Sequence, residues 1–212
     1  MNLPINFIHI PKNAGTSIKG ICDDNKIIYN SHNVNIFDSN IKNHLVIIRD
    51  PVLRFQSSVN YAFKFYTDSS PTLQILKKNN ITTANSWVTV LRNSNNIFYK
   101  NIMDEMLNDG TQYIRDGTEK AIYKWTYCPQ SLWINNPKYV ILMENINEEI
   151  QLLSNKINKN LILPHYNQST DVRTIEYMSP DNLNWLKYKF YKEDHKLYDN
   201  YKHMNVSKRL NL

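Results

Sequence analysis

Short apolar runs alternate with amphipathic stretches along the N-terminal third of the chain. Strands are predicted at residues 5–10, 26–29 and 44–48, and the consecutive aliphatic residues at 45–48 predict that the last of these strands is buried. Helices are predicted at 16–22 and 51–66, where the period changes to that of a helix. Alternation of this kind is typical of an α/β fold with a central, mainly parallel sheet flanked by helices.

The middle of the chain is more helical, and a strand and a helix follow it. The pattern predicts helices at 72–78, 84–92 and 99–107, which would form a helical insertion in the middle of the fold. A further buried strand is expected at 138–143, followed by an amphipathic helix at 146–157. The insertion would separate the first strands of the sheet from the last one.

Near the C-terminus, apolar residues recur at helical spacing. They are Leu183, Leu186, Phe190, Leu197 and Tyr201. A long helix is therefore expected to start at Pro180-Asp181, with this stripe in the core and with the adjacent Glu193 and Asp194 on a solvated face. The chain has 212 residues, 42% of them hydrophobic, and only 4 glycines, which favours a single domain spanning residues 1–212.

The first predicted strand breaks into a loop that has the chemistry of an anion site. Its sequence is Pro11-Lys12-Asn13-Ala14-Gly15-Thr16-Ser17. Pro11 ends the strand, and Gly15 can take the positive φ of a tight turn. Thr16 or Ser17 is expected to cap the next helix, whose N-terminal N–H groups and partial positive charge attract anions. Lys12 adds a full charge, so the loop predicts a nucleotide or phosphate-like ligand.

This loop differs from the usual phosphate-binding loop GxxxxGK[ST]. Its lysine opens the loop instead of preceding the hydroxyl residue, and no first glycine is present. An ordinary ATPase or GTPase is therefore disfavoured. Taken alone, the stretch also fits a strand-to-helix turn that carries a surface lysine.

A second motif follows the strand predicted at 44–48. Asp50 is expected to cap the next helix, with Pro51 at its first position. Arg49 would lie at the carboxyl end of the strand, which is the edge where open α/β sheets bind ligands. Ser57 is two turns into the helix and can face the same crevice, so that Arg49 and Ser57 hold one phosphate. The alternatives are a local ion pair between Arg49 and Asp50 and an ordinary surface serine.

Together, the two motifs resemble those of the carbohydrate sulfotransferases that use 3′-phosphoadenosine 5′-phosphosulfate (PAPS). The first motif of that family reads like HIPKTAGTS, and residues 9–17 depart from it only at Asn13. Its second motif resembles RDPxxRxxS, which is matched by Arg49, Asp50, Pro51, Arg54 and Ser57. Weaker similarities occur at Pro129-Gln130-Ser131, at Glu144 and at 163–169, so that the resemblance spans nearly the whole chain.

The resemblance implies a P-loop-like three-layer fold and an acceptor hydroxyl on a carbohydrate. It implies that Pro11, Lys12, Asn13, Ala14, Gly15, Thr16 and Ser17 hold the 5′-phosphosulfate. It also implies that Arg49 and Ser57 hold the 3′-phosphate that distinguishes PAPS from ATP. Asn13 replaces a threonine of the family motif but keeps a small hydrogen-bonding side chain that tolerates left-handed geometry, so we expect binding to survive.

Sulfuryl transfer needs a group that removes the proton of the acceptor, and histidine is the usual side chain for this near neutral pH. His32 follows the second predicted strand, and the resembling family carries its base between the two motifs. We therefore expect His32 to be the base, with loop packing as its alternative role and Glu144 as the alternative base. Lys12 is expected to neutralise charge on the leaving phosphate oxygen during in-line transfer. This scheme requires no metal.

The formal net charge of +6 and the pI near 9.1 favour anionic partners, including the cofactor and an acidic glycan. The basic residues are scattered and no recognition motif is present, so we expect no nucleic-acid partner. The two cysteines, Cys22 and Cys128, indicate neither a zinc site nor a disulfide framework.

No basic-plus-apolar leader and no apolar run of about 20 residues is present. We therefore expect a cytoplasmic protein without a membrane span, or a chain trimmed from a longer one. Two alternatives to a sulfotransferase stay open at this point. They are a P-loop-like nucleotide kinase and a catalytically inactive nucleotide-binding module.

Overall fold

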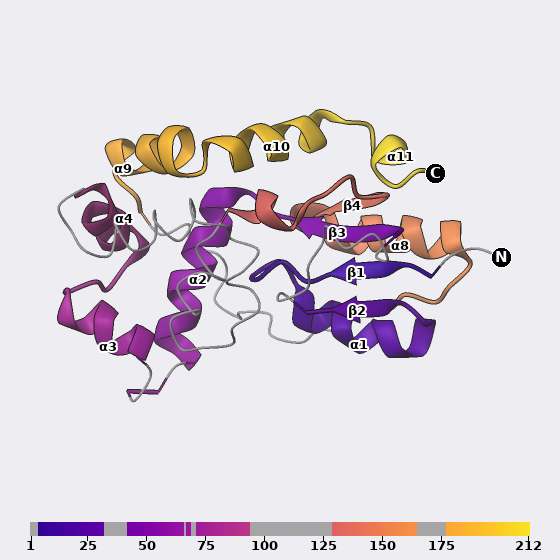
Figure 1. Cartoon of the computed structure of the whole chain (residues 1–212), viewed down its shortest axis with the longest axis horizontal. Helices are drawn as coiled ribbons and strands as arrows, with labels where there is room; N and C mark the ends of the chain where they lie inside the picture. The colour runs from indigo at the N-terminus through magenta and orange to yellow at the C-terminus, as the bar shows by residue number, and fades with distance from the viewer. Residues whose placement is uncertain (1–3, 32–41, 66, 69–70, 94–128, 165–176) are drawn as a thin grey trace.

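The structure, a computed structural model, describes residues 4–31, 42–65, 67–68, 71–93, 129–164 and 177–212. Its centre is a parallel sheet whose four described strands have the order β2-β1-β3-β4 (Figure 1). They are β1 (Asn6–Ile8), β2 (Ile28–Asn30), β3 (His44–Ile48) and β4 (Tyr139–Leu142). The prediction of an α/β fold with a parallel sheet is confirmed.

The strand order places a switch point at the carboxyl ends of β1 and β3. The chain passes from β1 to β2 on one side and then returns to the other side of β1 to form β3. The connections that leave β1 and β3 therefore diverge, and such a switch point is where open α/β sheets bind ligands. Both sequence motifs lie in these two connections.

Helices surround the sheet and extend beyond its carboxyl edge (Figure 1). Those of the N-terminal half are α1 (Gly15–Asn25), α2 (Pro51–Phe65), α3 (Pro71–Lys78) and α4 (Ala84–Arg92). Those of the C-terminal half are η1 (Gln130–Trp133), η2 (Met143–Asn145), α8 (Ile146–Ile157), α9 (Pro180–Trp185), η3 (Leu186–Phe190), α10 (Lys192–His203) and α11 (Val206–Arg209). The bounds predicted for β3, α4 and α8 are confirmed residue for residue, and the helix predicted at 99–107 lies outside the described residues.

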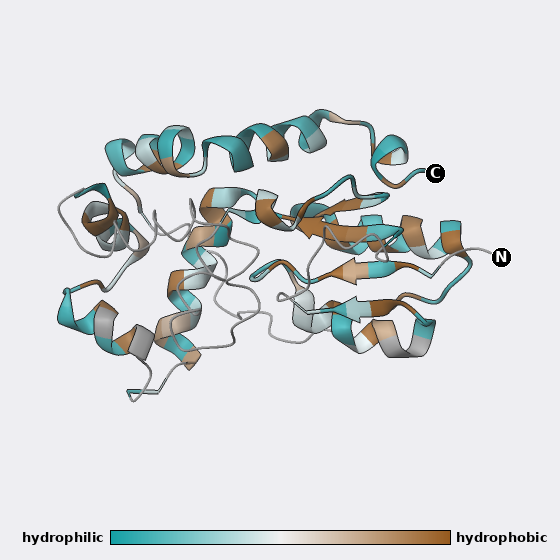
Figure 2. Cartoon of the chain, in the orientation of Figure 1, coloured by the Kyte–Doolittle hydropathy of each residue, from teal (hydrophilic) through white to brown (hydrophobic). Residues whose placement is uncertain are grey.

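Strands β1, β3 and β4 are buried on both faces, as continuous aliphatic runs indicate, whereas β2 is partly exposed. Phe7 and Leu45 lie opposite each other and pack in a core with α1 and α8. Their neighbours Ile8 and Val46 point the other way and pack with η1 and α10. Figure 2 shows the resulting hydrophobic colour along β3. A third core joins α2, α4 and η3, and it includes the fully buried Trp87.

The expected C-terminal helix is present but is interrupted by a π-helix. It begins at Pro180 as predicted, and η3 then widens to π geometry, where Tyr191 N donates to Leu186 O at 2.8 Å. The wider turn changes which residues of the next helix face inward. Asp194 and Tyr198 are the buried residues of α10, whereas Leu197 of the predicted stripe is only half-buried.

The C-terminal helix α11 is attached to α8 by a buried ion pair and to β4 by a hydrogen bond. The two terminal nitrogens of the Arg209 guanidinium lie 2.6 and 2.7 Å from the two Glu149 oxygens. Glu149 also accepts from Leu142 N at 2.9 Å, and Arg209 donates to Val140 O at 3.3 Å. Each buried charge therefore has an opposite charge and a backbone partner.

In the part of the chain that the structure describes, no helix combines the length and the apolar character needed to cross a membrane.

Candidate functional site

The start of α1 has no side-chain cap. Its N-cap residue is Ala14, its first residue is Gly15, and the first intrahelical bond joins Ile18 N to Ala14 O at 3.1 Å. The prediction that Thr16 or Ser17 caps this helix is wrong, since both lie inside its first turn. A helix start without a side-chain cap has backbone N–H groups that can bind an anion.

Gly15 is required here for space and not for its backbone conformation. The positive φ values of the loop belong to Lys12 (68°) and Ala14 (58°), so the prediction of a positive φ at Gly15 is wrong. A Cβ atom at Gly15 would lie 1.9 Å from Cδ2 of His9. The imidazole thus packs directly against the helix start, and its Nδ1 lies 2.7 Å from the Tyr29 hydroxyl.

Three cationic side chains meet at this loop. The Lys12 amine lies 3.3 Å from the centre of the Tyr61 ring, which belongs to α2. Arg49 Nη1 donates to Lys12 O at 3.4 Å, and the fully buried Arg54 donates from Nε to Pro11 O at 2.9 Å. The structure therefore brings together the two predicted cations, Lys12 and Arg49, and adds a third.

This environment disfavours the charged form of Lys12. Burial lowers the pKa of its amine, and the charges of Arg49 and Arg54 lower it further, to about 7. The amine has no carboxylate partner among the described residues, and it lies over the Tyr61 ring. An anion bound between these groups would relieve the repulsion and raise the pKa of Lys12 again.

The second motif forms the helix cap that the sequence predicts. Oδ1 of Asp50 accepts from Val52 N at 2.8 Å and from Leu53 N at 3.1 Å, so Asp50 caps α2. Its carboxylate is thereby turned toward the helix start. Ser57 is half-buried and precedes Tyr61 by four residues, so that both share one side of α2. Because the Tyr61 ring contacts the Lys12 amine, that side of the helix borders the loop.

The Gln130 side chain connects the two motifs. Its Oε1 accepts from Asn13 Nδ2 at 3.0 Å and from Arg49 N at 3.2 Å, and its Nε2 donates to Arg49 O at 2.8 Å. Asn13 Nδ2 also donates to Ile47 O at 2.8 Å. Asn13 and Gln130 have no exposed surface. The Asn13 side chain therefore supports the loop through two buried hydrogen bonds.

Asp194 supports this arrangement from α10. Its carboxylate accepts from Gln130 N at 2.6 Å and from Ser131 N at 2.9 Å. Burial raises the pKa of Asp194, whereas the Arg54 charge and the two hydrogen bonds act in the opposite direction. The prediction of a solvated face at Asp194 is wrong, because this side chain is fully buried.

Glu144 lies at the same sheet edge and joins neighbouring elements. Its Oε1 accepts from Asp50 N at 3.0 Å, and its carboxylate also forms a hydrogen bond with Tyr198. Burial raises the pKa of Tyr198, and the Glu144 charge raises it further. These contacts place Glu144 between β3, β4 and α10.

Two residues that the sequence analysis singled out have no described placement. His32 and Cys128 lie outside the described residues, so the role of His32 as base stays a prediction. Within the described ranges, no group of three His, Cys, Asp or Glu side chains is suited to a metal ion.

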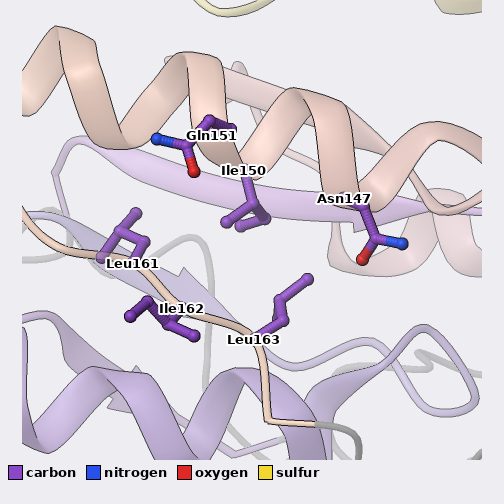
Figure 3. Close-up of a pocket in the computed structure, with 6 residues that line it drawn as sticks. All are labelled: Asn147, Ile150, Gln151, Leu161, Ile162 and Leu163. Atoms are coloured by element: carbon purple, nitrogen blue, oxygen red, sulfur yellow. The ribbon is translucent and has the colours of Figure 1, made fainter.

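A separate depression of about 300 Å³ lies beside α8 (Figure 3). It is lined by Asn147, Ile150, Gln151, Leu161, Ile162 and Leu163. Four of these six side chains are aliphatic and none is charged, so this depression does not suit a nucleotide. The cationic edge of the sheet is the better candidate site.

Comparison with known proteins adds no relative. No family model, curated protein or solved structure matches the chain.

Proposed function

We propose that the protein is a sulfotransferase with a P-loop-like three-layer fold that uses PAPS as its sulfuryl donor. The acceptor in this proposal is a hydroxyl group, with a carbohydrate as the expected class. The observation that carries the proposal is the meeting of Lys12, Arg49 and Arg54 beside the start of α1, which has no side-chain cap. This combination suits a ligand with more than one anionic group.

The chemistry of the donor set fits the two ends of PAPS. Residues 11–17 would hold the 5′-phosphosulfate through backbone N–H groups and the Lys12 amine. Arg49 and Ser57 would hold the 3′-phosphate. PAPS supplies a sulfuryl group that is bonded to a phosphate, and this phosphate is the leaving group. The Asp50 carboxylate repels the anionic cofactor only weakly, because it caps α2.

The residues of the chain have distinct roles in this proposal. Lys12 carries a proton at Nζ when an anion is bound, and its charge stabilises the leaving phosphate oxygen. The backbone of loop 11–14 orients the reacting group, because Arg54 and Asn13 hold that loop in place. His32 accepts the proton of the acceptor hydroxyl. The contacts of Glu144 with Asp50 and Tyr198 favour a structural role for that carboxylate.

The test of this proposal is the selectivity of Arg49. Arg49→Ala should weaken binding of adenosine 3′,5′-bisphosphate by about 10- to 100-fold, which is the value of a lost charge-assisted hydrogen bond. It should weaken binding of adenosine 5′-monophosphate much less. Arg92→Ala, which removes an arginine of α4 that bonds to Asn182, is the matched control and should change neither affinity. Equal losses for both nucleotides in Arg49→Ala would make Arg49 a structural residue.

Activity separates the enzyme from an inactive binding module. Labelled PAPS should transfer its sulfuryl group to an acceptor in a broad glycan panel, and His32→Ala should keep nucleotide binding but lose turnover. Binding without transfer to any acceptor would favour the inactive module. Equal turnover in His32→Ala and the parent would remove His32 as the base.

A further inference from the structure

Gln130 contacts both of the segments that follow strands β1 and β3. On the β1 side it accepts a hydrogen bond from the Asn13 side chain of the phosphate loop. On the β3 side it accepts from the N–H of Arg49 and donates to the carbonyl of the same residue. One amide group therefore joins the loop that carries Lys12 to the backbone that carries Arg49.

These contacts are hard to rearrange, because they are buried and because other groups fix their ends. The backbone of Gln130 is held by the Asp194 carboxylate, which itself lies near the Arg54 charge. The Asn13 amide is held through its nitrogen, which donates to Gln130 Oε1 and to Ile47 O. Its Oδ1 is buried without a hydrogen-bond partner within the described residues. Losing one partner of such a buried network leaves polar groups unsatisfied, which destabilises the arrangement.

We propose that Gln130 is a specificity-determining positioning residue, which sets the spacing between the phosphate loop and Arg49. The inference rests on the proposed function, in which these two segments hold the 5′- and 3′-phosphates. A fixed spacing favours a nucleotide whose two phosphates match it, because a rigid site loses less entropy on binding both groups. Asp194 acts through Gln130 and Ser131, so α10 contributes to the nucleotide preference without touching the ligand.

The experiment compares Gln130→Met with the parent protein. Methionine has a similar length but cannot bridge Asn13 and Arg49. Asn182→Met is the matched control, because Asn182 is a buried amide that bonds to Asn85 and Thr89 at the distant α4–α9 contact. Affinities for adenosine 3′,5′-bisphosphate and adenosine 5′-monophosphate are measured by calorimetry. We expect the ratio of the two affinities to fall about tenfold in Gln130→Met and to stay unchanged in Asn182→Met.

A second readout does not depend on the nucleotide. The pKa of the Lys12 amine is followed by NMR in the free protein, where Gln130→Met should raise it because the loop and the Arg49 charge can separate. If Gln130→Met does not fold, Asn13→Ala breaks the same bridge from the loop side and should give the same two changes.

The outcomes separate this inference from the proposed function. A parent that prefers the 3′-phosphorylated nucleotide, with an unchanged ratio in Gln130→Met, overturns the inference alone. If the parent protein does not prefer the 3′-phosphorylated nucleotide, the proposed function is overturned. The effect of Gln130→Met on the pKa of Lys12 then decides whether Gln130 positions the loop relative to Arg49. A raised pKa in Gln130→Met would support the positioning role, and an unchanged pKa would overturn it.

Discussion

Two regions of this protein bury charged groups in opposite ways. Between α8 and α11, Arg209 and Glu149 form a bidentate pair, and backbone groups complete their hydrogen bonds. At the carboxyl edge of the sheet, Lys12, Arg49 and Arg54 crowd together, with Asp194 as the buried carboxylate near Arg54. The Arg209 charge is therefore balanced in the first region, whereas the charges that act on the Lys12 amine in the second region are both positive.

The ion pair of Arg209 and Glu149 stabilises the fold, whereas the cluster of Lys12, Arg49 and Arg54 is suited to bind an anion. A buried pair whose groups are all satisfied gains nothing from an external ion. A cluster of like charges raises the free energy of the folded protein, and a bound anion lowers it again. We therefore expect that replacing Arg209 lowers stability without changing anion binding. Replacing Lys12 should raise the stability of the free protein and weaken anion binding.

The largest effect is expected at the balanced pair. Arg209→Met leaves the Glu149 carboxylate buried without its partner and should lower the free energy of unfolding by about 3–5 kcal/mol. The protein that stays folded should bind adenosine 3′,5′-bisphosphate as the parent does. Urea denaturation measures the loss. The double variant Glu149→Met/Arg209→Met should lose less than Arg209→Met alone, and an additive double loss would contradict the pairing argument.

A smaller effect, with two opposite signs, is expected at the charge cluster. Lys12→Met should weaken binding of the bisphosphate by about 10- to 100-fold, because it removes one charge-assisted contact. The free protein should become more stable at pH 6, since the pKa of Lys12 in the folded protein, about 7, lies below its ordinary value of 10.5. This gain is fully present below pH 7 and fades as the pH rises toward 10.5.

Lys19→Met is the control for that prediction. Lys19 is an exposed lysine of α1, and its amine lies 5.8 Å from the Tyr29 ring. Its replacement should change neither the stability at pH 6 nor the nucleotide affinity by a comparable amount. Thermal denaturation and calorimetry are measured on both variants. A loss of stability in Lys12→Met at pH 6 would show that the cluster is not strained in the free protein.

The smallest effect is expected in the number of protons that the charge cluster takes up when an anion binds. A bound anion raises the pKa of Lys12 from about 7, so the complex should take up protons at pH 8 and the affinity should fall as the pH rises above 7. Phosphate groups, with a second pKa of about 6, are already ionised at pH 8 and do not obscure the uptake. Calorimetry in two buffers with different ionisation enthalpies measures it. Lys12→Arg keeps the charge and should abolish the uptake.

The sequence predicted the local features of the fold and site well. The aliphatic run at 44–48 is the buried strand β3, and Asp50 caps the helix that follows it. Both features depend on neighbouring residues, whose pattern is visible along the chain. The functions of Lys12 and Arg49 stay predictions, but their meeting at one sheet edge is what their positions after two parallel strands indicate.

The parts that were missed depend on distant contacts. Gln130 lies 117 residues from Asn13, and Asp194 lies 64 residues from Gln130. No local spacing can pair these residues, and the π-helical turn before α10 moves Asp194 inward against the predicted stripe. Gly15 shows a subtler limit: a tight turn was expected there, and the packing of His9 is the actual constraint.

The central claim is that the cationic edge of the sheet holds a nucleotide with two separate phosphate groups. Calorimetric titration of the parent protein with adenosine 3′,5′-bisphosphate, adenosine 5′-monophosphate and ATP with magnesium tests it most directly. The account predicts that the bisphosphate binds about 10- to 100-fold more tightly than the monophosphate, since Arg49 adds one charge-assisted contact. Binding of ATP with magnesium but not of the bisphosphate would contradict the account and favour a nucleotide kinase.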